Sequence, residues 1–300
     1  MWEETNMKKL IFDCDNTMGI EGYPMDDALA FLYVLGNRDK VELLGFTCTF
    51  ANGTAAQVYE ASHQLLEEVD LSSLPLLKGA EKEEDPRSEA AQFIVDMANK
   101  YPGEVSVLAI GSMTNLYGAW LIDPQIFDKL KEIVLMGGIT EKLYTHGVHC
   151  PELNFSINNK ASAAVFTHGK RISIVTGNNC LPVSYLPKEE FMAKMEVETR
   201  PISAYVARKC GYRFDNRKAV YGEEGSYCWD AVAAAYLLYP ELFEDHWTAC
   251  DISEEHLQDG SLMPCEQGTT LLNLPQAKDA AAFRQNLYES WLALDFAVKE

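Results

Sequence analysis

The chain has 300 residues, of which 47% are hydrophobic and 23% charged, values that are typical of a globular protein and exclude wholesale disorder. Asp and Glu number 45 against 25 Lys and Arg, which gives a formal net charge of −20 at pH 7. This balance argues against nonspecific binding to DNA, RNA or an anionic membrane, because a phosphate-rich surface requires a basic partner. We therefore expect neither a nucleic-acid nor a membrane partner.

Three features indicate a soluble protein of the cytoplasm. No run of 18 or more apolar residues is present, so we expect no membrane span. Residues 1–5 are acidic and lack the basic and apolar segments of a signal peptide. The eight cysteines are scattered without a CxxC pair, which in a chain of this length indicates reduced thiols.

Short apolar segments alternate with helical patterns along the chain. Strands are predicted at 10–12, 41–50, 105–110, 133–136 and 172–175. Helices are predicted at 26–36, 55–69, 88–101, 114–121, 160–168, 188–196, 199–211, 230–238 and near 277–298. Apolar strands separated by helices are typical of a parallel sheet covered on both faces. The pattern predicts one α/β domain over residues 1–300, an open, mostly parallel twisted sheet with helices on both faces, as in Rossmann-like folds.

Segments rich in polar residues or glycine follow each of the first four predicted strands. They are Asp13 to Asn16, Ala51 to Gly53, Gly111 to Asn115, and Gly137 with Gly138. Because ligands bind at the carboxyl ends of parallel strands, we expect the functional site at this edge of the sheet. Within the third segment, Thr114 and Asn115 are expected to cap or brace the helix that begins there.

Four carboxylates, Asp13, Asp15, Asp26 and Asp27, lie within fifteen residues around the first strand end. Packed together they would repel one another and resist ionisation unless a cation sat among them. An all-oxygen cluster suits Ca²⁺ or Mg²⁺ better than zinc or copper. The alternative is that Asp26 and Asp27 merely begin a helix, where acidic residues interact favourably with the positive end of its dipole.

The segment Ile11 to Met18 resembles the first motif of the haloacid-dehalogenase-type phosphatases, Asp-x-Asp-x-Thr after an apolar strand. The resemblance implies that Asp13 is a phosphoryl-accepting nucleophile, that Asp15 is an acid/base and that Mg²⁺ is bound. It covers eight residues, and the later acidic metal motif of that family does not occur downstream.

A second resemblance extends over positions 8–240. Asp13-Cys14-Asp15 followed by Asp26 to Ala30 is similar to the opening of the calcium-dependent nucleoside hydrolases. Further blocks resemble that family in its own order: Asn52, 109–116, 133–138, 151–155 and 229–233. The resemblance implies a ribonucleoside hydrolase that cleaves the N-glycosidic bond with a Ca²⁺-activated water and releases free base and ribose. The remaining alternatives are the Mg²⁺-dependent phosphatase and a nonenzymatic nucleoside- or sugar-binding protein.

The same resemblance implies roles for individual residues. The Ca²⁺ ligands would be Asp15, Asp27, Asp230 and the backbone carbonyl of Leu135, a set that suits a hard cation. Asp15 would also be the general base that takes a proton from the water. The substrate-binding positions would be Asp26, Asn52, Glu152, Asn154 and Asp230. As alternatives, Glu152 and Asn154 would cap the following helix, and Asn52 would be a turn residue before Gly53.

Two departures from the family pattern affect these expectations. Ten residues, 16–25, separate the first two acidic pairs, where the family usually has three. Trp229 stands where a common subgroup has a His, so that we expect it to stack on the leaving base and to favour purines; the alternative is that it fills the core. His146 and His149 would lie near the 5′ end of the sugar or simply be solvated. The family also implies a homo-oligomer, a dimer or a tetramer.

Overall fold

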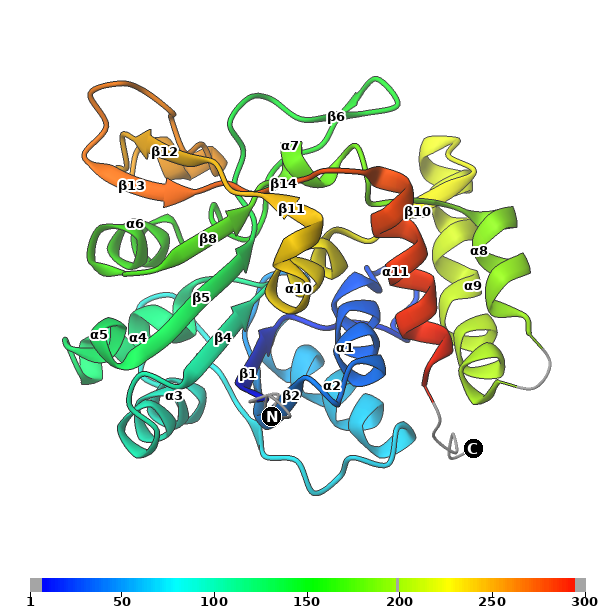
Figure 1. Ribbon diagram of the computed structural model, residues 1–300, viewed down its shortest axis with the longest axis horizontal. Coiled ribbons are helices and arrows are strands. Elements are labelled where there is room, and N and C mark those ends of the chain that lie inside the picture. The colour runs from blue at the N-terminus through cyan, green and yellow to red at the C-terminus, as the bar shows by residue number, and fades with distance from the viewer. Residues whose placement is uncertain (1–6, 198–199, 295–300) are drawn as a thin grey trace, which may run out of the picture.

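The computed structural model describes residues 7–197 and 200–294. Its centre is an eight-stranded sheet with the order β12-β13-β8-β5-β4-β1-β2-β3 (Figure 1). The strands of this sheet are β1 (Lys8–Cys14), β2 (Val41–Cys48), β3 (Leu76–Leu77), β4 (Val105–Ala109), β5 (Leu130–Met136), β8 (Ile172–Val175), β12 (Trp247–Cys250) and β13 (Thr270–Asn273). Neighbouring strands run parallel except β12, which pairs antiparallel with β13.

In the described part of the chain, three short antiparallel pairs lie outside this sheet. They are β6 (Tyr144–Thr145) with β7 (Val148–His149), β9 (Tyr185–Pro187) with β10 (Gly225–Tyr227), and β11 (Phe243–Glu244) with β14 (Gln276–Ala277). The first two pairs belong to segments that line or adjoin the functional site described below.

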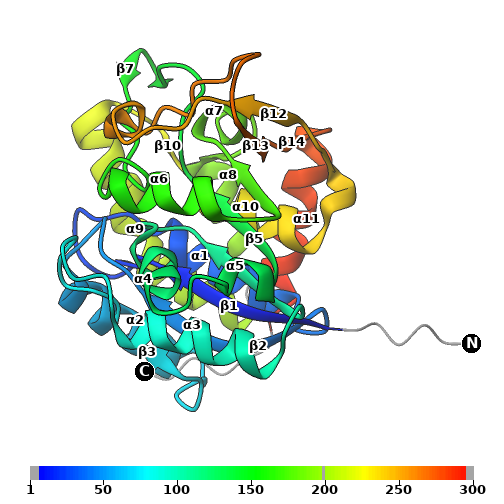
Figure 2. The same cartoon turned by 90° about the vertical axis from the view of Figure 1, so that its left-hand side faces the viewer.

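Helices cover both faces of the sheet. They are α1 (Asp26–Gly36), α2 (Ala55–Glu68), α3 (Glu89–Lys100), α4 (Thr114–Ile122), α5 (Ile126–Lys129), α6 (Asn159–His168), α7 (Gly177–Cys180), α8 (Lys188–Met195), α9 (Pro201–Tyr221), α10 (Trp229–Leu238) and α11 (Ala280–Leu292), with 3₁₀ turns at Pro240–Leu242 and His256–Asp259. One face carries α1, α10 and α11, and the other carries α3 to α6, which lie toward the viewer in Figure 2. No described helix is both long and apolar enough to cross a bilayer.

Strand β1 illustrates how the sequence builds this arrangement. Leu10 and Phe12 pack into the core on the α1 side, whereas Ile11 packs into the core on the α3–α6 side, as the period of two in a strand requires. The ring of Phe12 contacts Phe31 of α1 and Phe46 of β2, with ring centroids 5.1 and 5.2 Å apart. Helix α1 is apolar on nearly all sides, as a buried helix must be, and it packs between the sheet, α10 and α11.

The order of the strands places a crevice beside β1. From β1 the chain builds β2 and β3 on one side and then β4, β5 and β8 on the other. Crossovers therefore diverge between β1 and β4, and ligands bind at such a switch point beyond the carboxyl ends of the strands. The predicted mostly parallel α/β sheet is thus confirmed, with its polar strand ends on one edge.

Two predicted helices differ from those observed. The helix expected at 199–211 runs as α9 from Pro201 to Tyr221, and its expected first residue, 199, lies outside the described residues. The helix continues because Cys210 and Phe214 are both buried one turn apart. The helix expected near 277–298 is α11, and 295–298 lie outside the described residues. Strands β12 and β13 were not predicted.

Candidate active site

Three hydrogen bonds join the end of β1 to the start of α1 and to the loop after β2. The Asp15 N–H donates to Asp27 Oδ1 at 3.1 Å, and the Asn52 N–H donates to Asp15 Oδ2 at 2.5 Å. The side-chain amide of Asn52 donates to Asp27 Oδ2 at 3.3 Å. Both carboxylates are fully buried, and Asp15 Oδ1 has no hydrogen-bond partner among the described residues. This oxygen is therefore available to a bound group.

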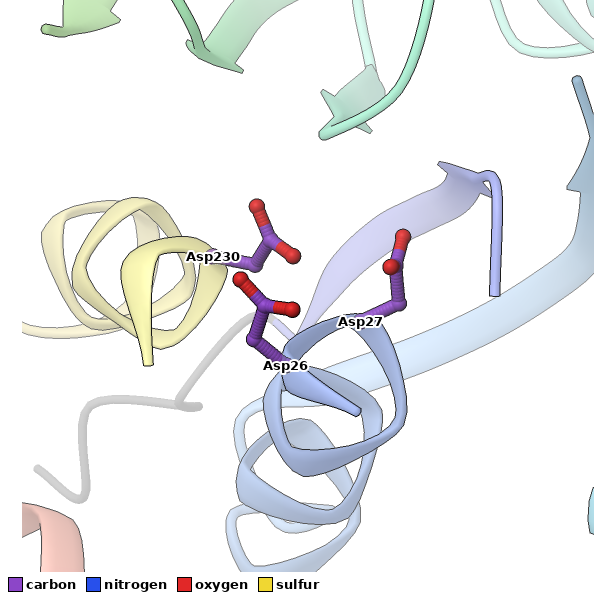
Figure 3. Close-up of side chains that lie close together, drawn as sticks. All are labelled: Asp26, Asp27 and Asp230. Atoms are coloured by element: carbon purple, nitrogen blue, oxygen red, sulfur yellow. The ribbon is translucent and has the colours of Figure 1, made fainter. Parts of the chain in front are cut away.

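Two helix N-termini bring three carboxylates together. Asp26 and Asp27 begin α1, and Asp230 lies in the first turn of α10, which packs against α1. One oxygen from each side chain lies within 4.8 Å of the other two. Figure 3 shows Asp26 and Asp230 facing each other between the two helices, with Asp27 on the side of β1. The positive ends of both helix dipoles partly offset the repulsion within this group.

The pKa values of these carboxyl groups indicate a site that needs a cation. Burial raises the pKa of Asp15 to about 7, and burial with neighbouring carboxylates raises those of Asp27 and Asp230 well above their usual range. Burial also raises the pKa of Asp26, although the nearby guanidinium of Arg213 opposes this effect. A divalent cation removes the repulsion, and carboxylate oxygens are the donors that Ca²⁺ and Mg²⁺ prefer. The residues present therefore fit a hard divalent cation.

Asp13 is not part of this carboxylate group, which corrects the expectation that all four early acids share one cluster. Its Oδ1 accepts hydrogen bonds from Thr47 Oγ1 at 2.6 Å and from Asn115 Nδ2 at 2.7 Å. Asn115 also donates to the carbonyl of Cys48 at 2.8 Å. Asn115 thus links α4 to β1 and β2, with the fully buried Asp13 as one acceptor. It was predicted to cap or brace the start of α4, but the N-cap of α4 is Met113 and, among the described residues, no side chain caps this helix.

Gly111 allows the loop after β4 to pass directly against Asp15. A Cβ atom at position 111 would lie 2.7 Å from Asp15 Oδ1 and 2.6 Å from Thr49 Cγ2. These distances are below van der Waals contact, so a larger residue would displace the carboxylate oxygen that has no protein partner.

A cavity of about 170 Å³ opens beside the carboxylates at the carboxyl ends of β1, β4 and β5. Residues that the sequence predicted to bind substrate or to act in catalysis line it: Asp26, Asn52, Glu152, Asn154, Trp229 and Asp230. Asp15 and Asp27 lie next to it through their hydrogen bonds to Asn52. Leu135 is the penultimate residue of β5, between β4 and β8, and the metal-binding role of its carbonyl stays a prediction.

Glu152 and Asn154 are held by the backbone at the cavity wall. Glu152 accepts hydrogen bonds from the N–H groups of Gly138, Phe155 and Ser156 at 2.8–3.0 Å. Gly138 has φ +71°, a left-handed conformation that presents its N–H to this carboxylate. Asn154 Nδ2 donates to the carbonyls at the ends of β4 and β5, Ile110 at 2.9 Å and Met136 at 3.0 Å. These bonds fix both side chains in place, and their roles toward a sugar stay predictions.

Trp229 is half-buried and lines the cavity with one aromatic neighbour. Its indole lies parallel to the ring of Tyr227, with centroids 4.7 Å apart and an interplanar angle of 14°. Of the two loop histidines, His149 is exposed in β7, whereas His146 Nδ1 lies 3.2 Å from both Glu223 Oε1 and Tyr227 Oη.

Sequence reasoning missed two arginines in the cavity wall. Arg213 and Arg217 of α9 both line it, and Arg217 donates to Glu223 Oε2 through Nε at 2.7 Å and through Nη2. They escaped notice because the predicted helix ended at 211. Their spacing of four residues, which places them on one helix face, was the available signal.

The ten-residue segment 16–25 fills the space between β1 and α9. The Gly19 N–H donates to the hydroxyl of Tyr212, that hydroxyl donates to the carbonyl of Tyr23, and Arg213 donates to the carbonyl of Gly22, each at 3.4 Å. Pro24 lines the cavity. The extra residues thus bring α9 to the wall of the site, and they leave Asp26 and Asp27 within reach of Asp230.

Comparisons with known proteins identify the family of the chain. The family model of the inosine-uridine preferring nucleoside hydrolases matches residues 10–285. A probable uridine nucleosidase 1 of Oryza sativa subsp. japonica is 26% identical over 271 residues, 80% of each chain. Among solved structures, a plant nucleoside hydrolase has a TM-score of 0.81 at 18% identity, covering 96% of this chain and 99% of its own. A purine-preferring ribonucleoside hydrolase from Gardnerella vaginalis has a TM-score of 0.80 at 21% identity, covering 95% and 99%.

The fold and the carboxylate group define an α/β protein with a candidate metal site at the carboxyl edge of its sheet. The chain belongs to the inosine-uridine preferring nucleoside hydrolase family, whose members hydrolyse the N-glycosidic bond of nucleosides. The binding-protein alternative is thereby set aside. The family match over residues 10–285 sets aside the phosphatase alternative as well, because it assigns the chain to a different class of hydrolase.

Proposed function

We propose that this nucleoside hydrolase is a Ca²⁺-dependent ribonucleoside hydrolase that prefers purine nucleosides and releases free base and ribose. The observation that carries the metal part is the buried group of Asp26, Asp27 and Asp230 beside the unpartnered oxygen of Asp15. Asp15, Asp27, Asp230 and the carbonyl of Leu135 would hold the cation. When bound, Ca²⁺ lowers the pKa of water in the site.

Asp15 is the general base in this proposal. Its Oδ2 accepts the hydrogen bond from the Asn52 N–H, whereas its Oδ1 has no partner among the described residues. Oδ1 is therefore the atom placed to take a proton from the attacking water. Gly111 leaves space beside this buried oxygen, since a Cβ atom there would lie 2.7 Å from it.

The ribose hydroxyls are bound by the polar wall of the cavity. Asn154 has committed its amide hydrogens to two backbone carbonyls, which leaves its Oδ1 to accept from a hydroxyl. Asp26, Asn52, Glu152 and Asp230 complete the substrate-binding set around the same cavity. Carboxylate and amide groups suit hydroxyls, which both donate and accept.

The preference for purines rests on Trp229. Its indole and the stacked ring of Tyr227 form an aromatic wall on which a purine base can lie. Stacking of this kind contributes on the order of 1 kcal/mol beyond burial. Similar proteins carry names of both kinds. The solved structure from Gardnerella vaginalis is called purine-preferring, whereas relatives from rice and Arabidopsis thaliana are named uridine nucleosidases and one from Escherichia coli is called pyrimidine-specific. Uridine is therefore the competing substrate.

Release of reducing sugar from a nucleoside panel, with and without EGTA, tests the proposal. We expect ribose release from inosine and guanosine at a higher kcat/KM than from uridine, and loss of activity in EGTA that added Ca²⁺ restores. Trp229→Ala should reduce kcat on purines selectively in a protein that still folds. A faster reaction with uridine than with inosine would contradict the stacking role, and equal loss on all nucleosides would assign Trp229 to the core.

We also propose that the protein works in the cytoplasm as a homodimer or homotetramer, with a small-molecule nucleoside as its substrate. Light scattering coupled to size-exclusion chromatography measures the oligomeric state directly, and a monomeric mass would contradict this part.

A further inference from the structure

A chain of hydrogen bonds joins the aromatic wall of the cavity to a partly exposed histidine and a buried glutamate. It begins at Tyr227, passes through His146 of the β6–β7 hairpin, and ends at Glu223, which is held by Arg217. Both contacts of His146 are long-range, because it lies 81 residues from Tyr227 and 77 from Glu223 in the sequence. The hairpin and the end of α9 are thus joined at the cavity wall.

The hydrogens in this chain can be assigned by chemistry. Arg217 has no acceptor, so its two hydrogen bonds hold Glu223 as an acceptor. His146 Nδ1 lies 3.2 Å from Glu223 Oε1, so this nitrogen carries a hydrogen and donates it. The same nitrogen is 3.2 Å from the hydroxyl of Tyr227. Because this nitrogen already carries a hydrogen, it does not accept the phenolic hydrogen of Tyr227. The phenolic hydrogen is left for a group inside the cavity.

Exposure makes the chain suitable for moving a proton. The side chain of Glu223 is 1% exposed, whereas that of His146 is 48% exposed and therefore reaches solvent. Tyr227 lines the cavity, and its ring is stacked on Trp229. Burial raises the pKa of the Tyr227 hydroxyl to about 12, so that it carries its proton at neutral pH.

A leaving base needs a proton that the other groups of the wall do not supply. The indole of Trp229 has an N–H donor but no titratable proton, and the guanidinium groups of Arg213 and Arg217 do not deprotonate in proteins. The carboxylates of the site are engaged with the cation and the sugar. Cys150 also lines the cavity, and burial raises the pKa of its thiol.

We propose that Tyr227 is the acid that protonates the departing base and that His146, positioned by Glu223, returns the proton to Tyr227. This inference rests on the proposed nucleoside hydrolysis. As the C1′–N bond breaks, its electron pair goes to the base nitrogen, which takes the hydroxyl proton of Tyr227. The phenolate takes the Nδ1 proton of His146 while Nε2 of the same ring takes a proton from solvent, so that the imidazole stays neutral, and exchange with solvent then restores the Nδ1–H form. The attacking water gives its oxygen and one hydrogen to C1′ and its other proton to Asp15.

A pair of substrates with different leaving groups tests this inference. Inosine leaves as a base that must be protonated, whereas 4-nitrophenyl riboside releases an anion that is stable at neutral pH. Tyr227→Phe should lose about 100-fold or more in kcat on inosine and stay within about threefold of the wild type on 4-nitrophenyl riboside. Circular dichroism and Tm establish that the variant is folded.

Two further variants keep the test decisive. His146 has φ +49°, a conformation that Asn tolerates, so His146→Asn removes the proton path without straining the hairpin, and it should show the same selective loss. Tyr185→Phe is the matched control, because Tyr185 packs on both His146 and Tyr227 but is not among the residues that line the cavity, and it should retain activity on both substrates.

Equal losses on the two substrates for Tyr227→Phe and His146→Asn would overturn the inference while leaving nucleoside hydrolysis intact. A selective loss in Cys150→Ala, with none in Tyr227→Phe, would assign the acid to Cys150 and would also overturn it. A wild-type protein that cleaves neither substrate would overturn the proposed function itself, and the inference with it.

Discussion

Asn115 donates one amide hydrogen to Asp13 at 2.7 Å and the other to the carbonyl of Cys48 at 2.8 Å, and so ties the ends of β1 and β2 to α4. All three residues are buried. We expect Asn115→Ala to lower the free energy of unfolding by about 3 kcal/mol, because it leaves a carboxylate and a carbonyl without this donor. Urea denaturation measures the change. Asn99→Ala, on the exposed face of α3, should change it by less than about 0.5 kcal/mol.

The cation site predicts a defined response to removal of one carboxylate. Asp27→Asn and Asp230→Asn should each reduce turnover to below about 1% of the wild type, since the buried oxygens that hold the cation are lost. Calorimetric titration with Ca²⁺ should show weaker binding in both variants. Asp128→Asn, at an exposed ion pair with Lys170, is the control and should bind Ca²⁺ normally. Full activity of the wild type in EGTA would contradict a metal-dependent site.

Stability of the chelated protein should fall as the pH rises from about 4 to 7. Burial raises the pKa of Asp13 and of Asp15 to about 7, so the folded state retains protons that the unfolded state has already released above its ordinary pKa. Their contribution is fully present below the unfolded pKa and is lost as the pH approaches the folded value, by about 1.4 kcal/mol per pH unit for each group.

Urea denaturation at several pH values in EGTA measures this slope. Asp13→Asn keeps an acceptor for Thr47 and Asn115 but cannot titrate, so it should flatten the slope relative to the wild type. Asp128→Asn should leave it unchanged. Stability that rises with pH between 4 and 7 would contradict the burial of these carboxyl groups.

Glycine at position 111 should be required for activity. A Cβ atom there would lie 2.7 Å from Asp15 Oδ1, so Gly111→Ala should displace the proposed base and reduce kcat by about 100-fold, with a smaller effect on Tm. Gly211→Ala is the matched control. A Cβ at 211 meets nothing within 4 Å, and Ala stabilises a helix by about 0.5–1 kcal/mol, so activity should be retained. An active Gly111→Ala enzyme would exclude Asp15 Oδ1 as the base.

The polar wall of the cavity should discriminate against substrates that lack a hydroxyl. Buried groups built to bond a hydroxyl are left unpaired when it is missing, so 2′-deoxyinosine should have a kcat/KM at least about 100-fold below that of inosine. Steady-state kinetics with both nucleosides measure the ratio. Equal values would show that Asp26, Glu152 and Asn154 do not bind the ribose.

The sequence alone was enough to place polar residues at one edge of a mostly parallel sheet. Strand ends in such a sheet share an edge whatever the details of packing, so Asp15 after β1 and Asn52 after β2 had to lie near each other, and they are joined by a 2.5 Å hydrogen bond. Asp26 and Asp27 likewise predicted the N-terminus of α1, because acidic residues are favoured at the positive end of a helix dipole. The sequence placed Asp230 in this group only through the family resemblance, because Asp230 lies far from the other acidic residues along the chain.

Other features depended on tertiary packing. Asp13 and Asp15 are two residues apart on one strand end, yet Asp13 bonds to Thr47 and Asn115 because α4 presents an amide on that side. Helix α9 was predicted to end at 211, although Phe214 follows Cys210 by one turn, and only the packing of the structure shows that both are buried. Its extension carries Arg213 and Arg217 to the cavity wall.

The link between Tyr227 and His146 shows the same limit most clearly. The two residues are 81 positions apart and meet because the β6–β7 hairpin folds over the end of α9 and β10. Side-chain contacts between distant segments follow from how loops pack on a completed sheet, and periodicity along the chain carries no information about them. The strand ends were determined by local pattern, whereas the wall that faces the base was decided by tertiary structure.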